Sequence, residues 1–462
     1  MQVISDRVDI ICHGRAGESG TGTGLLVEQQ THVALSKTKD LATDLMERIC
    51  ELANLNRAYK RVKSNKGAPG VDGMTVEELG DWIRCNKEQL IKSLVGGSYQ
   101  PNPVRKVEIP KSGKVNEKRM LCIPTVVDRL VQQAIHQILE PIFDPTFSES
   151  SYGFRPGRKA HDAVKQASEY VREGHVWCVD IDLEKFFERV NHDILMSRLA
   201  RKIGDKRLLK IIRRILESGI MQEGICIERH EGTPAGGPLS PLLSNILLDE
   251  VDKELKRRGH KFCRYADDQN VYVRSKRAGE RVFESVKQFL AKKLKLRINE
   301  HKSAVALVKE RKFLGFRIQL DGRISMAPET VQRAKDKIRQ LTWRNRGKSF
   351  NVVIDQLNEY LRGWLGYYYL ASWPSVWREF DSWIRRKLRC YKLKQKKRGS
   401  TIARYLMSLG IGEIESRKLG SSGKGWWRLS RTRTLHRALD NAWFKDQGLI
   451  CLEEKWALLL KA

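Results

Sequence analysis

The stretch KFCRYADDQNVYVRS, residues 261–275, decides the fold. Two β-prone runs, 262–265 and 271–273, flank the polar segment Ala266-Asp267-Asp268-Gln269, which predicts a β-hairpin with two adjacent acids at its tip. Adjacent like charges repel each other, and magnesium takes oxygen ligands from one or two carboxylates together with substrate phosphates. The motif therefore indicates a metal platform, and a solvated Asp-Asp turn is the alternative that it leaves open.

A second acidic segment, HVWCVDIDLEKFFERV (175–190), begins as an apolar run interrupted by Asp180 and Asp182. In a strand, a spacing of two places both carboxylates on one face, where burial costs free energy unless a partner or a metal compensates. Phe187 follows at a position suited to pack beside whatever the acid binds. One of the two acids could instead cap a helix formed by LEKFFERV.

The third element is GTPAGGPLSPLLSNILLDEVD, residues 232–252. Its glycines allow the backbone to approach a ligand closely, and Ser240-Pro241 opens an apolar helix whose first N–H groups can hold a phosphate. Many ordinary turns share this composition, so the segment indicates a binding site only in combination with the two acidic segments.

Charge and tryptophan are concentrated near the C-terminus. The 462 residues include 86 Lys and Arg against 55 Asp and Glu, a formal charge of +31, which favours a polyanionic partner: nucleic acid first, an anionic membrane surface second. Residues 331–462 hold 29 basic against 11 acidic residues, a net of +18, and nine of the eleven tryptophans. Such a mixture suits RNA binding, although tryptophans that only pack in a core are an equal alternative.

Hydrophobic periodicity places the main helices. Residues 1–40 are rich in Gly, Ser and Thr and predict a loose leader, and 41–320 predict alternating helices and strands. An apolar stripe from Val127 to Leu139 predicts a helix that stops before Pro141. Further helices are expected at about 329–342 and 351–370, and no strand is expected beyond about residue 320. No apolar run reaches the roughly 20 residues of a membrane span.

Three elements, taken in chain order, resemble the palm of a reverse transcriptase. They are Asp182, the loop of residues 233–238, which we call the Gly-Pro loop, and Tyr265-Ala266-Asp267-Asp268. The resemblance extends over about residues 50–450, through segments similar to the ordered blocks of group II intron-encoded reverse transcriptases and to their maturase domain. The polymerase-like segments are 107–135, 151–164, 299–303 and 313–316, and the maturase-like segments are 361–373 and 383–398.

The resemblance implies an α+β right-hand polymerase, with fingers and an antiparallel-sheet palm followed by an α-helical thumb and a helical maturase domain. The expected boundaries are a leader at 1–40, fingers and palm at 41–320, a thumb and maturase region at 321–400, and a basic RNA- or DNA-binding region at 401–462. Because only His436 and Cys451 follow residue 390 among potential His and Cys ligands, no HNH endonuclease is expected.

The resemblance also implies the site. Asp182, Asp267 and Asp268 are the expected catalytic metal ligands for two Mg²⁺ ions, with Asp182 preferred to Asp180 because Phe187 lies five positions on. Lys302 matches the lysine thought to protonate departing pyrophosphate, although a surface lysine is nearly as good an interpretation. The residues expected to bind the deoxynucleoside triphosphate are Arg105, Lys111, Arg119, Phe187, Ala235 and Gly236.

One position departs from the family pattern. The family usually has Thr-Pro-Gln-Gly-Gly, with the glutamine against the incoming nucleotide, whereas this chain has Ala235. The absence of that glutamine would weaken nucleotide binding or fidelity while leaving the expected metal ligands in place.

The function implied is that of an RNA-directed DNA polymerase of a group II intron, which also binds the intron RNA as a maturase and supports splicing and mobility by target-primed reverse transcription. The expected partners are the intron RNA and a target DNA primer, in a ribonucleoprotein of the bacterial cytoplasm without a membrane, and a dimer is one option for its oligomeric state. The alternatives are a splicing maturase with weakened or lost polymerase activity, and a related reverse transcriptase serving defence or repair.

Overall fold

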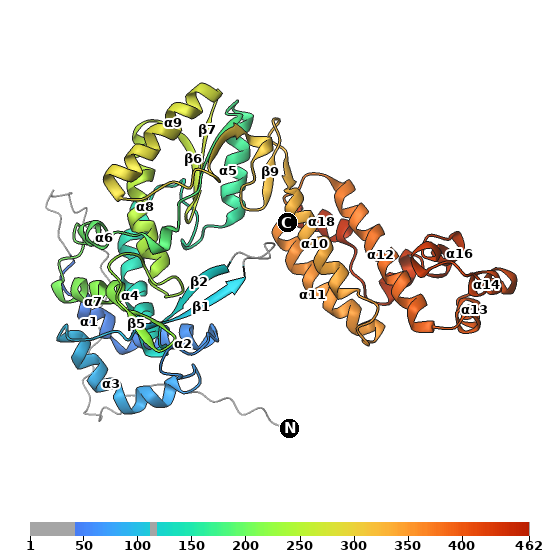
Figure 1. Cartoon of the computed structure of the whole chain (residues 1–462), viewed down its shortest axis with the longest axis horizontal. Coiled ribbons are helices and arrows are strands. Elements are labelled where there is room, and N and C mark those ends of the chain that lie inside the picture. Colours follow the sequence, from blue (N-terminus) through green and yellow to red (C-terminus); the bar gives the residue numbers. More distant parts are fainter. Residues whose placement is uncertain (1–41, 111–117, 462) are drawn as a thin grey trace, which may run out of the picture. The chain divides into compact units, whose positions relative to one another are not determined.

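The computed structural model describes residues 42–110 and 118–461 (Figure 1). These residues form two compact units, each of which is assembled from several segments of the chain. The first unit comprises the residues up to Arg158 together with Ile181–Gln269 and Glu280–Ala304, and the second comprises Lys159–Asp180, Asn270–Gly279 and the residues from Val305 onward. The order of helices and strands along the chain is the one expected for the α+β class, so this prediction of the fold class is confirmed.

The first unit combines a cluster of helices with a four-stranded sheet. Its strands, in the order β2-β1-β4-β5, pair antiparallel except for the parallel β1–β4 pairing. They are β1 (Val104–Pro110), β2 (Lys118–Ile123), β4 (Ile220–Gln222) and β5 (Ile225–Ile227). The helices are α1 (Leu45–Cys50), α2 (Leu52–Ser64), α3 (Leu79–Val95), α4 (Val126–Phe143), α6 (His192–Leu199), α7 (Lys206–Glu217) and α8 (Ser240–Arg257).

Capping and amphipathicity explain why these helices form. In α7, the Asp205 carboxylate accepts hydrogen bonds from the Arg207 and Leu208 N–H groups, and the apolar residues recur on one buried face. In α4, Thr125 caps the first turn by accepting from the Asp128 N–H, and the buried Asp128 carboxylate accepts from the Tyr99 hydroxyl at 2.7 Å. The helix starts are therefore fixed by side chains as well as by burial.

The end of α4 differs from its prediction. The helix passes through Pro141 and ends at Phe143, so the expected stop before Pro141 is wrong. Proline removes one N–H donor and crowds the preceding turn, but here it stands in the last turn, where little helix remains to be disrupted. Phe143 and Leu139 are buried, and their burial favours continuing the helix.

A second four-stranded sheet contains the hairpin predicted from residues 261–275. Its strand order is β6-β7-β3-β8. These strands are β3 (Trp177–Ile181), β6 (Lys261–Tyr265), β7 (Asp268–Val273) and β8 (Ala304–Leu307). Helix α9 (Lys276–Phe289) and a π-helical turn (Leu290–Leu294) follow the hairpin.

The second unit is mainly helical in its C-terminal part. Helix α5 (Ala160–Arg172) and the hairpin β9 (Phe316–Ile318) and β10 (Ile324–Met326) precede the helices α10–α18. Strand β10 overturns the expectation that no strand follows residue 320; three residues are too few for a periodic signal, and the strand depends on pairing with β9. The helices are α10 (Pro328–Leu341), α11 (Phe350–Tyr368), α12 (Pro374–Lys396), α13 (Gly399–Ser408), α14 (Glu413–Gly420), α15 (Trp426–Leu429), α16 (Arg433–Ala438), α17 (Asn441–Asp446) and α18 (Leu452–Leu459).

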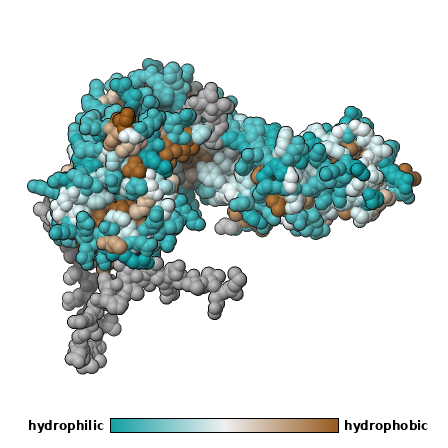
Figure 2. All heavy atoms as spheres, turned by 60° about the horizontal axis from the view of Figure 1, so that its bottom comes forward, coloured by the Kyte–Doolittle hydropathy of each residue, from teal (hydrophilic) through white to brown (hydrophobic). Residues whose placement is uncertain are grey.

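One continuous apolar core joins α10–α18. Trp377 of α12 is fully buried at its centre and meets Trp364 of α11 edge-on, with ring centroids 5.3 Å apart. The face of these helices drawn in Figure 2 is mostly hydrophilic, with scattered apolar spots. Across the described ranges we find no helix that combines the length and the low polarity needed to cross a bilayer.

Candidate functional site

The turn of the β6–β7 hairpin carries the adjacent acids. Strand β6 ends at Tyr265 and β7 begins at Asp268, so Ala266 and Asp267 form a two-residue turn and the predicted hairpin is confirmed. Ala266 has a φ of 59°, in the left-handed region that a residue with a Cβ adopts at a cost. Something outside the turn must therefore hold this conformation.

Arg264 supplies that support from inside the protein. Its guanidinium is 1% exposed and forms an ion pair with Asp252 of α8, which is 0% exposed, through hydrogen bonds of 2.6–3.0 Å. The same guanidinium donates to the Ala266 carbonyl at 3.0 Å and to the Ser151 hydroxyl at 2.7 Å. One buried side chain thus ties the strained turn to α8 and to the loop that contains Ser151.

The loop before α5 closes around the same turn. Asn245 of α8 accepts a hydrogen bond from Arg264 and donates one to the Gly153 carbonyl, each at 2.9 Å. A Cβ on Gly153 would lie 2.3 Å from the Ala266 nitrogen, closer than any real contact permits. Gly153 is therefore needed for a close backbone approach, which explains the glycine within SYGF, residues 151–154.

Asp182 stands at the end of strand β3, held through its backbone. Its N–H donates to the Ser303 hydroxyl at 2.9 Å, and its carbonyl accepts from the Asn299 N–H at 2.8 Å. Lys302 Nζ lies 3.6 Å from the Asp182 carboxylate. The NEHKS segment, residues 299–303, therefore positions the acid and places a cation beside it.

Asp180 has a different environment. In the second unit, Arg311 Nε donates to its carboxylate at 2.8 Å, which supplies the partner that a carboxylate on a strand needs. The segment after Asp182 forms a short 3-10 helix, Phe186–Glu188, whose N-cap is Lys185. The alternative that Asp180 or Asp182 caps this helix is thus wrong.

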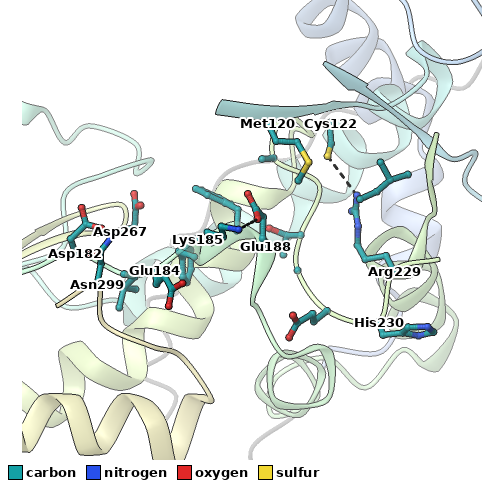
Figure 3. A pocket seen from close by; sticks show the side chains of 18 of the residues that line it. Met120, Cys122, Asp182, Glu184, Lys185, Glu188, Arg229, His230, Asp267 and Asn299 are labelled. Atoms are coloured by element: carbon teal, nitrogen blue, oxygen red, sulfur yellow. Dashed lines mark hydrogen bonds and ion pairs between the residues drawn. The ribbon is translucent and has the colours of Figure 1, made fainter. Parts of the chain in front are cut away.

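A pocket of about 1140 Å³ in the first unit brings many of the predicted residues together. The predicted residues that line it are Asp182, Asp267, Lys302, Phe187 and Ala235. Figure 3 shows Asp182, Asp267 and Asn299 gathered at one end, with Met120, Cys122 and Arg229 at the other. The pocket thus joins acids from two distant segments to strand β2 of the other sheet.

The remaining predicted residues lie elsewhere or are not described. Asp268 begins β7, Arg105 lies in β1 opposite Ile123, and neither is among the residues that line the pocket. Lys111 lies outside the described residues, and the backbone of Arg119 pairs with Ile109 in the β1–β2 hairpin. The proposed roles of these residues stay predictions.

The Gly-Pro loop is anchored to β2 by its backbone. The Ala235 carbonyl accepts from the Cys122 N–H at 2.8 Å. Gly236 has a φ of 128°, and a Cβ there would lie 2.6 Å from the Cys122 carbonyl oxygen. Gly236 is thus required by the approach to β2, and the placement of the loop does not depend on the side chain at position 235.

Sequence reasoning missed several polar residues of the pocket. Arg229, in the segment between β5 and the Gly-Pro loop, is buried, and burial lowers the pKa of its guanidinium. Its Nη2 lies 3.6 Å from the Cys122 sulfur, and Nη1 has no hydrogen-bond partner among the described residues. No periodicity marks this irregular segment, so only its proximity to the Gly-Pro loop could have indicated the residue.

The donor chemistry of the pocket fits a divalent cation that arrives with substrate. In the described part of the chain, no group of three or more His, Cys, Asp or Glu side chains is arranged to hold a metal ion. Magnesium, however, is commonly bound through one or two carboxylates plus phosphates and water, and Asp182 and Asp267 line one pocket with ample space between its walls. We infer a metal site in which the phosphates of a bound nucleotide supply the remaining ligands.

A hairpin acid and a second strand-end acid that line one large pocket fit a template-directed polymerase of the palm type. Residues 109–318 match the family of reverse transcriptases (RNA-dependent DNA polymerases), and residues 331–408 match the maturase-specific domain of group II introns.

Individual proteins are similar to this chain over much of its length. Protein YkfC of Escherichia coli is 34% identical over 57% of this chain and 80% of its own length. Group II intron-encoded protein LtrA of Lactococcus lactis is 29% identical over 68% of each chain. Among solved structures, a partial Cas6-RT-Cas1–Cas2 complex has a TM-score of 0.36 at 25% identity, covering 57% of this chain and 45% of that one.

The chain belongs to the group II intron reverse transcriptase and maturase family. It is an RNA-directed DNA polymerase, which uses nucleotides and divalent metal ions, and its maturase domain binds intron RNA.

Replacing Asp252 by Ala should lower the free energy of unfolding by about 3–5 kcal/mol, because Arg264 would keep a buried charge without its carboxylate. Urea denaturation measures this, with the exposed Asp321→Ala as the control that should change little.

The double variant Arg264→Met, Asp252→Leu separates stability from positioning. Apolar replacement of a buried ion pair is often neutral, so stability should return toward that of the parent. DNA synthesis by the double variant should nevertheless remain below that of the parent, because the Ala266 carbonyl would be left without its donor. A double variant that copies RNA at the parental rate would contradict the role given to Arg264.

Proposed function

We propose that the enzyme copies its intron RNA into DNA from a primer supplied by the target DNA, within a ribonucleoprotein of the bacterial cytoplasm. The observation that carries this proposal is the meeting of Asp182 and Asp267 in one pocket that Lys302, Phe187 and Ala235 also line. Carboxylates and a cation at one end of a large pocket suit a primer hydroxyl and a triphosphate, which carry the reacting atoms of DNA synthesis.

Each residue then has a role in the transfer of a nucleotide. Asp182, Asp267 and Asp268 would hold the metal ions, two in our proposal, with Asp268 contributing from the start of β7. Bound ions of this kind activate the primer hydroxyl and neutralise the developing charge on the phosphates. Lys302, whose Nζ lies 3.6 Å from the Asp182 carboxylate, donates the proton that departing pyrophosphate needs. Phe187 lies under the sugar and disfavours a 2′-hydroxyl.

The hairpin of strands β1 and β2, which belongs to the proposed fingers, supplies positive charge for the triphosphate. Arg105, Lys111 and Arg119 keep this proposed role, and we add Lys118, which lines the pocket from β2. A hydrogen bond from Lys118 to Glu108 at 2.8 Å raises the pKa of the lysine.

Changing both Asp267 and Asp268 to Ala should abolish DNA synthesis and leave binding of RNA intact, because the basic helical region is untouched. Primer extension on an RNA template with Mg²⁺ and RNA anisotropy measure the two properties on the same preparation. The matched control is Asp321→Ala, an exposed acid far from the pocket in sequence. Loss of RNA binding in a folded Asp267→Ala, Asp268→Ala variant would overturn the division of labour.

Ala235 favours a second candidate, a maturase whose polymerase has weakened. Since the loop is held by its backbone, Ala235→Gln should add a nucleotide hydrogen bond without moving the loop, and the KM for deoxynucleotides should fall several-fold, by about the value of one such bond. Steady-state primer extension measures this, with Ala235→Ser as the control for a short polar side chain. An unchanged KM in both variants would show that position 235 does not touch the nucleotide.

The C-terminal helices are proposed to act as the thumb and maturase region (321–400) and as a basic RNA- or DNA-binding region (401–462). The lysine-rich end of α12 shows which charges are available. Lys392 and Lys396 lie over aromatic rings, 4.6 Å from the centroid of Phe350 and 4.1 Å from that of Tyr405 respectively. Lys394, Lys397 and Arg398 are exposed and are the better candidates for binding phosphates.

Replacing Lys394, Lys397 and Arg398 together by Ala should flatten the dependence of log affinity on log salt by roughly one for each phosphate that is no longer neutralised. RNA binding at several salt concentrations measures the slope. The control variant Lys292→Ala, Lys293→Ala, Arg297→Ala removes the same charge from exposed positions of the first unit and should keep the parental slope. Equal slopes in the two variants would place the RNA elsewhere.

A further inference from the structure

The tryptophans of the last 132 residues divide into two groups by exposure. Seven are buried or half-buried, so the packing alternative holds for most of them. Trp343, in the loop after α10, is 62% exposed, and Trp427 of α15 is 40% exposed. Both line a single small pocket of about 260 Å³ within the second unit, together with Arg339, Arg344 and Lys387.

We call this cavity the Trp343–Trp427 pocket. Its positively charged side chains lie close to one another. Lys387 Nζ lies 5.0 Å from the centroid of the Trp427 ring, and the guanidinium carbon of Arg386 lies 3.5 Å from it. Burial, followed by the nearby charges of Arg339, Arg344 and Arg386, lowers the pKa of Lys387. Asp336 pairs with Arg339 and offsets part of this charge. An anion in the pocket would relieve the remaining repulsion.

We propose that the Trp343–Trp427 pocket binds one unpaired nucleotide of the intron RNA, with its base on an exposed tryptophan ring and its phosphate against Arg344 and Lys387. The inference rests on the RNA-binding role of this region and names a site for it. The volume lies just below the roughly 300 Å³ at which pockets for drug-sized ligands begin, so it suits one base and not a longer segment.

Chemistry favours an unpaired nucleotide over the other polyanions. A base in a duplex is already stacked on both faces, whereas an unpaired base can stack on an aromatic side chain, which contributes sequence-tolerant affinity. An acidic peptide would use the cations but would leave the ring of Trp343, which is 62% exposed, without a partner of matching shape. The neighbouring Arg386 on Trp427 shows that the ring already accepts a flat cationic group on its face.

The test uses the full chain and fluorescence anisotropy with three labelled probes of one sequence: a 12-nucleotide single-stranded RNA, the same RNA in a duplex, and the corresponding single-stranded DNA. Trp343→Ala should weaken binding of single-stranded RNA about five- to 100-fold, as expected when one base no longer stacks, with a smaller effect on the duplex. Trp343→Phe should recover most of the affinity, because it keeps a ring. Arg344→Ala should instead reduce the salt slope by about one.

Trp343 is exposed, so its variants should fold, and circular dichroism checks this. Lys293→Ala, which removes an exposed cation of the first unit, is the control and should bind like the parent. Three results would overturn the proposal: parental affinity in Trp343→Ala, an equal loss for duplex and single strand, or a loss confined to the DNA probe. Failure of the parent chain to bind any RNA would instead contradict the RNA-binding function on which the proposal rests.

Discussion

The buried ion pair between Arg264 and Asp252 is the interaction on which the proposed polymerase site depends. A left-handed conformation at Ala266 is unfavourable in isolation, and the turn adopts it at the residue directly before Asp267. The guanidinium satisfies the Ala266 carbonyl while its charge is balanced by Asp252, and Asn245 and Ser151 occupy its other donors. An ordinary surface pair could not fix a backbone in this way, because it exchanges with water.

The two acids that meet in the pocket are held by different means. Asp267 is placed by the hydrogen bonds around Arg264, whereas Asp182 is placed through its own backbone by Ser303 and Asn299. The basic helices of the second unit have their own core, built on Trp364 and Trp377, so the RNA-binding charge does not depend on the acidic pocket for its stability.

The sequence predicted the parts of this architecture that carry a local signal. Two β-prone runs on either side of Ala266-Asp267 predicted the hairpin, and the 3.6-residue stripes predicted α4, α10 and α11 to within a few residues. It failed where a local rule was outweighed by tertiary packing: α4 continues through Pro141 because Phe143 is buried, and β10 forms only because β9 pairs with it. Arg229 carries no periodic signal, and only its proximity to the Gly-Pro loop along the chain could have indicated it, since its contact with Cys122 of β2 depends on tertiary structure. The division of the tryptophans between packing and surface likewise depends on tertiary structure, which no local pattern encodes.

The most direct test is the position of the metal. A structure of the full chain with an RNA template, a DNA primer, an incoming nucleotide and Mn²⁺ in place of Mg²⁺ would locate the ions by anomalous scattering. We predict Mn²⁺ within coordination distance of both Asp182 and Asp267 and of the nucleotide phosphates. Ions bound to other side chains, with Asp182 still paired to Lys302, would contradict the proposed site.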